Sequence, residues 1–426
     1  MKALEQSPST KEIYFWNIAG SMFNAMLSVL ILMVVTRVLP SDQADIFSIG
    51  WTISQLMATI GTYQLRVYQA TDITEKFRFK EYLIFRFLSV FVMLVVSYIY
   101  VILKGYDGYK ALIVLILCLF RAVEAITDVY EGWLQQKERL DLVGKAIVYR
   151  IVLALLFFGA SLIWTGNLLI ASIVLVLSYV FCLLAYDVRY RLKLANFYRT
   201  NNENCCKNWI GNMIKEGAPL FINAFLMMSI TNAPKMVIDQ AIENGNMANG
   251  IQTIFNILFM PASFLSLAYI VFRPMVTQMA IEWNTGKANQ FLRILMRIFV
   301  WLLLLAVFIM IGSAILGIPI LSLFYAIDLK GYKMELLIII LGGCLYTFAI
   351  ILDNALIVIR RQYLLVIAYV FTWGFVKITA NLMVERWRTV GAALVYTIGM
   401  SVFFLCMAVM FLVCLGKTGR TLKKGK

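Results

Sequence analysis

The run Ile13–Thr36, IYFWNIAGSMFNAMLSVLILMVVT, contains no charged residue. A helix needs about 20 mostly apolar residues to cross the hydrocarbon core of a bilayer, so this run predicts a membrane-spanning helix. It is too long for the apolar core of a signal peptide, and no small-residue cleavage site follows it, so we expect an uncleaved first span. Nine further charge-free runs follow it, at Ile46–Leu65, Phe87–Leu103, Ile151–Tyr186, Gly217–Pro234, Asn244–Phe272, Ile298–Ile327, Leu336–Leu352, Gln362–Val376 and Thr389–Gly416.

The composition extends this prediction to the whole chain. Of the 426 residues, 62% are hydrophobic and 14% are charged, whereas a soluble domain is about 45–50% apolar and about 25% charged. This excludes soluble enzymes and secreted disulfide-rich proteins. The chain has no His, and its seven Cys form no CxxC pair, so the sequence predicts neither a metal site nor a cofactor. The net charge of +15 is typical of membrane-protein loops and does not indicate nucleic-acid binding.

Two segments need separate treatment in the span count. Ile151–Tyr186 is too long for one span, and Thr165-Gly166-Asn167 is expected to break it into a helical hairpin. Ala111–Trp133 is mostly apolar but carries charged residues, and we interpret it as a polar span. The sequence therefore predicts an all-α polytopic membrane protein of about twelve transmembrane helices.

The distribution of Lys and Arg predicts the orientation. With an even number of spans and both termini in the cytoplasm, most of the 38 basic residues fall in cytoplasmic segments, as the positive-inside rule requires. We therefore expect a multi-pass protein of the inner (cytoplasmic) membrane. The external loops are short and leave no room for a catalytic domain, so we do not expect an enzyme.

Short matches in the two halves indicate a repeat. Phe23-Asn24-Ala25 in the first expected span resembles Ile222-Asn223-Ala224 in the seventh, and Asp42-Gln43-Ala44 resembles Asp239-Gln240-Ala241. They occur in the same order and at equivalent spans, which predicts two parallel six-helix bundles, residues 1–200 and residues 201–426.

The polar span contains four ionisable residues, Arg121, Glu124, Asp128 and Glu131. Their spacing of three, four and three residues places them on one face of a helix. A charge in a span costs about 2.5–3.5 kcal/mol on insertion scales and usually faces a cavity or a partner. We therefore expect this stripe to line a wet cavity, with Arg121 near the membrane midplane. The alternative is an Arg121–Glu124 pair that only neutralises itself.

Further ionisable residues lie within or at the ends of other spans. The candidates are Arg37, Arg66, Lys235, Asp353 and Lys377. Snorkelling toward the membrane surface would also explain Arg37, Arg66 and Lys235. Lys377 has only apolar residues, Trp373 and Gly374 nearby in sequence, which favours a position facing a cavity.

Two segments resemble the bacterial lipid-linked polysaccharide flippases, the O-antigen and capsule repeat-unit translocases. They are Arg66-Val67-Tyr68-Gln69-Ala70-Thr71-Asp72 and the stretch Arg121–Arg150, with Arg121-Ala122-Val123-Glu124, Asp128, Gly132 and Gln135-Gln136-Lys137-Glu138-Arg139-Leu140-Asp141. These proteins belong to the multidrug/oligosaccharidyl-lipid/polysaccharide exporter superfamily. Length, span count and two-half layout are similar over essentially the whole chain.

The resemblance implies two six-helix bundles around a central cationic cavity. It also implies that an undecaprenyl-diphosphate-linked oligosaccharide crosses from the inner to the outer leaflet by alternating access. Arg121, Lys377, Arg66, Lys235 and Arg37 are the expected substrate-binding residues, because basic side chains can compensate a diphosphate. The expected sites for a coupling H⁺ or Na⁺ are Glu124, Asp128 and Asp353. The expected partners are membrane lipids, a glycan polymerase and glycosyltransferases, with no nucleic acid.

Two alternatives remain at this stage. A multidrug and toxin extrusion antiporter of the same superfamily would use Glu124, Asp128 and Asp353 for cations, but Arg121 at the midplane would repel a cationic cargo. A membrane-bound glycan polymerase or ligase would need a sizeable external loop with catalytic groups, and the external loops here are short.

Overall fold

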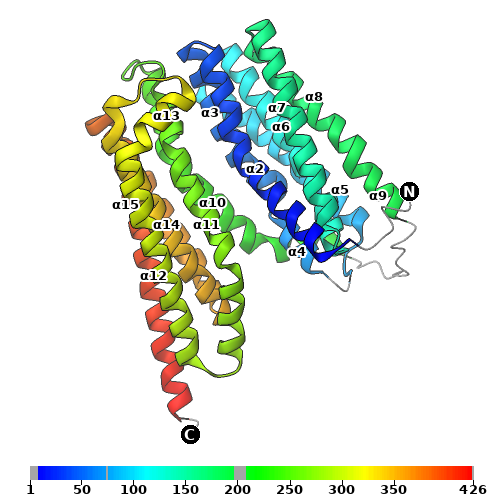
Figure 1. The fold of residues 1–426 in the computed structure, drawn as a ribbon, viewed down its shortest axis with the longest axis vertical. Coiled ribbons are helices and arrows are strands. Elements are labelled where there is room, and N and C mark those ends of the chain that lie inside the picture. The colour runs from blue at the N-terminus through cyan, green and yellow to red at the C-terminus, as the bar shows by residue number, and fades with distance from the viewer. Residues whose placement is uncertain (1–7, 73–74, 196–207, 425–426) are drawn as a thin grey trace. The chain divides into compact units, whose positions relative to one another are not determined.

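The computed structural model describes residues 8–72, 75–195 and 208–424, and all regular structure in these ranges is helical (Figure 1). The chain divides into two compact units, Met1–Phe225 and Leu226–Lys426. The boundary between them falls inside α10 (Trp209–Glu243). The boundary expected at residue 200 lies outside the described residues, and the assignment of six spans to each half stays a prediction.

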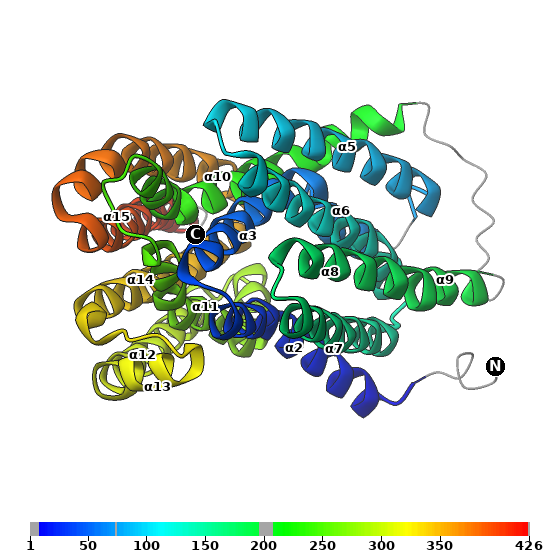
Figure 2. The same cartoon turned by 90° about the horizontal axis from the view of Figure 1, so that it is seen from above.

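In the first unit, four long helices pack through two pairs. The pairs are α2 (Thr10–Val38) with α7 (Leu140–Thr165), and α3 (Ser41–Thr62) with α6 (Gly108–Gln136). Figure 2 shows α5 (Phe79–Lys104) beside α6, and α8 (Leu168–Cys182) beside both α6 and α7. The short α4 (Leu65–Thr71) lies against α6. A π-helix, η1 (Leu183–Val188), and α9 (Arg189–Leu194) continue α8.

In the second unit, α14 is the most widely connected helix. It packs against α15, α11 and α12. The helices are α11 (Ile251–Asn284), α12 (Ala288–Gly312), η2 (Ser313–Gly317), α13 (Ile318–Tyr325), η3 (Lys330–Tyr332), α14 (Lys333–Val358), η4 (Gln362–Leu364) and α15 (Leu365–Lys424). The backbone of α15 is not helical at Arg388 (φ 50°, ψ −125°), so α15 consists of two helical segments that meet at a kink.

Local sequence explains the breaks between helices. The break expected at Thr165-Gly166-Asn167 is confirmed. Gly166 has the left-handed conformation (φ 60°) that ends α7, and the Asn167 side chain accepts hydrogen bonds from the backbone N–H groups of Leu169 (2.9 Å) and Ile170 (3.3 Å) at the start of α8. Asp107 caps α6 in the same way, accepting from the Lys110 N–H at 2.7 Å.

The membrane character of the fold is visible in its exposed side chains. Along α5, large apolar residues such as Phe91 and Ile102 are exposed, and Trp164 at the end of α7 is 86% exposed. Lipid, unlike water, imposes no cost on such a surface. Within the described residues, eight helices are long and apolar enough to cross a membrane. The all-helical membrane architecture is therefore confirmed, while the count of about twelve spans and their two-bundle arrangement stay predictions.

Two parts of the loop interpretation were wrong. The charge-free runs that begin at Phe87 and Ile151 place Arg86 and Arg150 just outside the expected spans, but these residues lie in α5 and α7 and are buried. The run that ends at Tyr186 places Asp187 just outside the expected span, but the chain is helical to Leu194 and Asp187 is buried in η1. These side chains enter the bundle because, as the site shows, each has a partner of opposite charge there.

Candidate functional site

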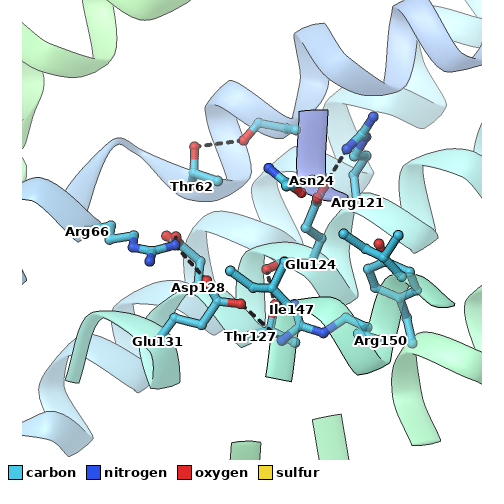
Figure 3. Close-up of a pocket in the computed structure, with 13 residues that line it drawn as sticks. Asn24, Thr62, Arg66, Arg121, Glu124, Thr127, Asp128, Glu131, Ile147 and Arg150 are labelled. Carbon is cyan, nitrogen blue, oxygen red and sulfur yellow. Dashed lines mark hydrogen bonds and ion pairs between the residues drawn. The ribbon is translucent and has the colours of Figure 1, made fainter. Parts of the chain in front are cut away.

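A cavity of about 180 Å³ lies within the first unit (Figure 3). All four ionisable residues of the α6 stripe line it, which is the arrangement expected from their spacing. Its walls come from α2, α3, α4, α6, α7 and α8, and the lining residues are Asn24, Ala58, Thr62, Arg66, Arg121, Glu124, Thr127, Asp128, Glu131, Ile147, Arg150, Ile151 and Tyr179.

The turn between α3 and α4 places Arg66 at this cavity. Tyr63 (φ 45°) and Gln64 (φ 52°) both have the left-handed backbone conformation, which ends α3 and lets a new short helix begin. The Gln69 side chain then donates a hydrogen bond to the Val129 carbonyl of α6 at 3.1 Å. Gly132 allows this approach, since a Cβ there would lie 2.4 Å from Gln69 Oε1.

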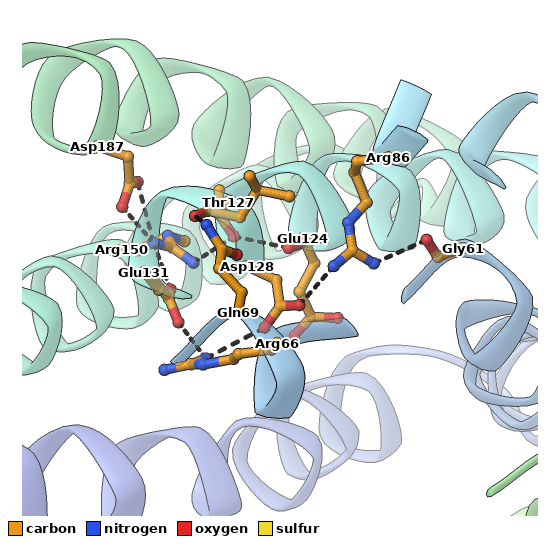
Figure 4. Close-up of polar contacts among 11 residues, drawn as sticks. Gly61, Arg66, Gln69, Arg86, Glu124, Thr127, Asp128, Glu131, Arg150 and Asp187 are labelled. Atoms are coloured by element: carbon orange, nitrogen blue, oxygen red, sulfur yellow. Dashed lines mark hydrogen bonds and ion pairs between the residues drawn. The ribbon is translucent and has the colours of Figure 1, made fainter. Parts of the chain in front are cut away.

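Arg66 joins two carboxylates of α6. Its Nη1 lies 2.6 Å from Glu131 Oε2 and 3.2 Å from Asp128 Oδ1. Asp128 also accepts from Arg86 Nη2 at 2.9 Å, and Arg86 Nη1 donates to the Gly61 carbonyl at 2.8 Å (Figure 4).

Arg150 forms the second centre of the network. Its Nη2 lies 3.0 Å from Glu131 Oε1 and 3.0 Å from Asp187 Oδ2, and its Nη1 donates to Thr127 Oγ1 at 2.9 Å. Glu131 therefore bridges Arg66 and Arg150, while Arg150 bridges α6, α7 and η1. One continuous chain of charge-assisted contacts connects Arg86, Asp128, Arg66, Glu131, Arg150 and Asp187.

Arg121 lies apart from this chain. Its Nη1 contacts Glu124 Oε2 at 2.5 Å, and its guanidinium lies over the ring of Trp51 at 4.4 Å and near that of Phe120 at 5.1 Å. The Arg121–Glu124 pair considered as the alternative is thus present, but it does not account for Asp128 and Glu131, which bind other arginines.

The site is balanced in charge. Four guanidiniums, of Arg66, Arg86, Arg121 and Arg150, are matched by four carboxylates, of Glu124, Asp128, Glu131 and Asp187. Charges buried in an apolar bundle require such pairing, because an isolated one would be strongly disfavoured. Any ionic ligand must therefore displace one of these partners.

The remaining predicted site residues lie elsewhere. Arg37 is exposed at the end of α2 and does not line the cavity. In the second unit, Lys235 is buried on α10 with its ammonium 4.5 Å from the Phe259 ring centre, and Asp353 is half-buried on α14. Lys377 on α15 is exposed and makes no ion pair with the residues that the structure describes.

Sequence reasoning missed Arg86, Arg150 and Asp187 as site residues. Each stands at the edge of a long apolar run, next to Phe87, Ile151 or Tyr186. A helical charge at the edge of an apolar run cannot be distinguished from a loop charge by composition. The available signal was Arg150, which belongs to the segment that carries the family resemblance.

Comparison with known proteins supports the fold. The chain matches no protein-family model. It is 23% identical over 389 residues to the capsular polysaccharide biosynthesis protein CapF of Staphylococcus aureus, covering 89% of this chain and 93% of CapF. The lipid II flippase MurJ in an inward closed conformation superposes with a TM-score of 0.64 at 13% identity, covering 94% of this chain and 86% of MurJ.

A second solved structure agrees. A point mutant of the Vibrio cholerae MATE transporter VcmN superposes with a TM-score of 0.64 at 12% identity, covering 98% of each chain. The chain has the fold of the MOP-superfamily membrane transporters. Solved structures with this fold include a lipid II flippase and multidrug resistance MATE transporters. The MOP fold is common to lipid flippases and drug transporters, so the choice between these cargoes depends on the site.

Proposed function

We propose that this MOP transporter is a flippase that moves an undecaprenyl-diphosphate-linked oligosaccharide from the cytoplasmic to the outer leaflet by alternating access. The observation that carries the proposal is the arginine-lined cavity of the first unit. Arg66, Arg121 and Arg150 line one space inside an apolar helical bundle. A diphosphate cannot cross hydrocarbon unaided, and guanidiniums are the side chains best suited to bind its oxygens.

The remaining parts of the proposal follow from the sequence. We further propose that both termini lie in the cytoplasm, that each half of the chain contributes six helices, and that a glycan polymerase and glycosyltransferases act before or after transport. The further residues proposed to contact substrate or a coupling H⁺ or Na⁺ are Arg37, Lys235, Lys377, Glu124, Asp128 and Asp353. Relatives named for capsule biosynthesis and for lipid II flipping support a lipid-linked glycan as the cargo.

The second candidate, a cation antiporter, is favoured by the similarity to MATE transporters and by the carboxylates of the cavity. Each carboxylate that lines this cavity is bound to at least one arginine, however. An organic cation would have to displace a guanidinium and leave it without a carboxylate, whereas an anion that draws Arg66 away leaves Asp128 with Arg86 and Glu131 with Arg150, so the site favours an anionic headgroup.

Proteoliposomes containing a fluorescent undecaprenyl-diphosphate-linked sugar test the function. Headgroup transfer is followed by its accessibility to a membrane-impermeant quencher. We expect the wild-type protein to transfer the lipid and Arg121→Ala to lose most of that rate. Arg189→Ala, which removes an exposed arginine of α9 in the same unit, is the matched control and should keep it. Equal rates in Arg121→Ala and wild type, or export of an organic cation without lipid transfer, would contradict the proposal.

A further inference from the structure

Arg66 is the most exposed member of the arginine network. Its side chain is 31% exposed, compared with 2% for Arg86 and 5% for Arg150. It stands on the short helix α4 and reaches its carboxylates through a long, flexible side chain. Arg86 and Arg150 are held by further hydrogen bonds, to the Gly61 carbonyl and to Thr127 respectively. An anion entering the cavity therefore meets Arg66 as its most available partner.

The contacts of Arg66 allow it to leave without stranding a carboxylate. Asp128 keeps Arg86 at 2.9 Å, and Glu131 keeps Arg150 at 3.0 Å. Each carboxylate that Arg66 binds thus has a second guanidinium, from α5 in one case and from α7 in the other. This double pairing is what an exchangeable cation requires, because removing the sole partner of a buried charge is strongly unfavourable.

Departure of Arg66 nevertheless leaves the buried charges unequal. Three guanidiniums would then face four carboxylates, and the surplus falls on Arg150, which alone would serve both Glu131 and Asp187. The side chains of Glu131 and Asp187 are 5% and 0% exposed. A proton on one of these two carboxyls neutralises the surplus negative charge without a further counter-ion. An uncompensated charge at this depth would be disfavoured.

We propose that a diphosphate headgroup takes Arg66 away from Asp128 and Glu131, and that the Glu131–Asp187 pair around Arg150 then binds about one proton. The headgroup and the proton therefore bind together, and each strengthens the binding of the other by the same factor. This proposal rests on the proposed function. It names the carboxyls that take up the proton and states that proton binding and headgroup binding favour each other.

Other titratable and charged groups surround this pair on every helix packed against it. They are Arg66 on α4, Arg86 on α5, Arg121, Glu124, Asp128 and Tyr130 on α6, Tyr149 on α7, Tyr179 and Cys182 on α8, Tyr186 on η1, and Tyr190 and Arg191 on α9. Glu124 already has Arg121 and Asp128 has Arg86, so a change at Arg66 affects Glu131 and Asp187 most.

Calorimetry on the full-length protein in lipid nanodiscs tests the proposal. The probe is farnesyl-diphosphate-linked glucose, a disubstituted diphosphate whose own charge does not change near neutral pH. Titrations in buffers of different ionisation enthalpy report the protons taken up on binding. We expect about one proton per probe, and a Kd that falls about tenfold for each pH unit of acidification across the titration range.

Two variants and one control locate the residue pair that binds the proton. Asp187→Asn and Glu131→Gln each remove one carboxylate from the pair, so both should bind the probe without proton uptake. Glu131→Gln keeps the Asp187–Arg150 contact and serves if Asp187→Asn does not fold. Asp141→Asn is the matched control: Asp141 is also buried and paired with an arginine, Arg139 at 2.9 Å, but it does not line the cavity. It should take up the proton as wild type does.

The outcomes separate this inference from the proposed function. Probe binding without proton uptake by the wild-type protein would overturn the inference and leave the flippase proposal intact. Uptake that persists in both Asp187→Asn and Glu131→Gln, or affinity that rises with Na⁺ at fixed pH in place of proton uptake, would also overturn it. Failure of the wild-type protein to bind the probe at all would overturn the proposed function and the inference with it.

Discussion

Replacing Arg66 or Arg150 by Ala should change the stability of the protein to very different extents, although each arginine makes two ion pairs. In Arg66→Ala, Asp128 keeps Arg86 and Glu131 keeps Arg150. Arg66 is partly exposed, both of its carboxylates keep a guanidinium, and a proton can neutralise the one surplus charge, so we expect a cost well below that of Arg150→Ala. In Arg150→Ala, Glu131 keeps Arg66, but Asp187 loses the guanidinium that holds it. An unpaired charge of this kind costs about 3–5 kcal/mol.

Unfolding in mixed micelles, monitored by tryptophan fluorescence, measures the two costs. Arg66→Ala should unfold near the wild-type denaturant concentration yet lose probe binding, whereas Arg150→Ala should unfold much earlier. The double variant Arg150→Met with Asp187→Leu should recover much of the loss, because an apolar pair of similar volume can replace a buried ion pair. If Arg66→Ala is as unstable as Arg150→Ala, then Arg86 and Arg150 do not stabilise Asp128 and Glu131 after Arg66 leaves. The proposal that Arg66 exchanges its partners would then be wrong.

Two glycine substitutions test the packing around the site. Gly144→Ala should destabilise the first unit by about 1–3 kcal/mol, because its Cβ would lie 2.0 Å from the Trp16 carbonyl oxygen. Gly159→Ala on the same helix is the control: its Cβ would meet nothing closer than 4.0 Å, so the stability should not change. Equal melting temperatures of the two variants would refute this prediction. Gly132→Ala should displace the Gln69 side chain, and the loss of its hydrogen bond to α6 should cost about 1 kcal/mol of stability. The displacement should also move α4 and weaken probe binding. Unchanged probe affinity would count against the role of Gln69 in anchoring α4.

Helical periodicity was sufficient to predict half of the site. The positions Arg121, Glu124, Asp128 and Glu131 share a face of any helix, so their common cavity follows from spacing alone. The break at Thr165-Gly166-Asn167 was equally predictable, because Gly and Asn determine helix ends through local geometry.

The other half depends on contacts between distant segments. Arg86, Arg150 and Asp187 are charged residues at the edges of apolar runs, and each is buried beside a partner of opposite charge on another helix. A single sequence carries no measure of that pairing. The two segments that carry the resemblance contact each other, since Arg66 and Gln69 of one bind Asp128 and Val129 of the other.

The charge balance of the cavity also discriminates between cargoes of opposite sign. A cation that replaced Arg66 between Asp128 and Glu131 would leave the Arg66 guanidinium without either of its carboxylates. An anion that draws Arg66 away supplies its new counter-ion, while Asp128 and Glu131 retain Arg86 and Arg150. Only the second exchange keeps every fixed charge paired, apart from the single surplus that a proton can neutralise. A cavity that contains as many carboxylates as arginines can therefore select an anionic headgroup, because selectivity depends on which partner can leave and not on net charge.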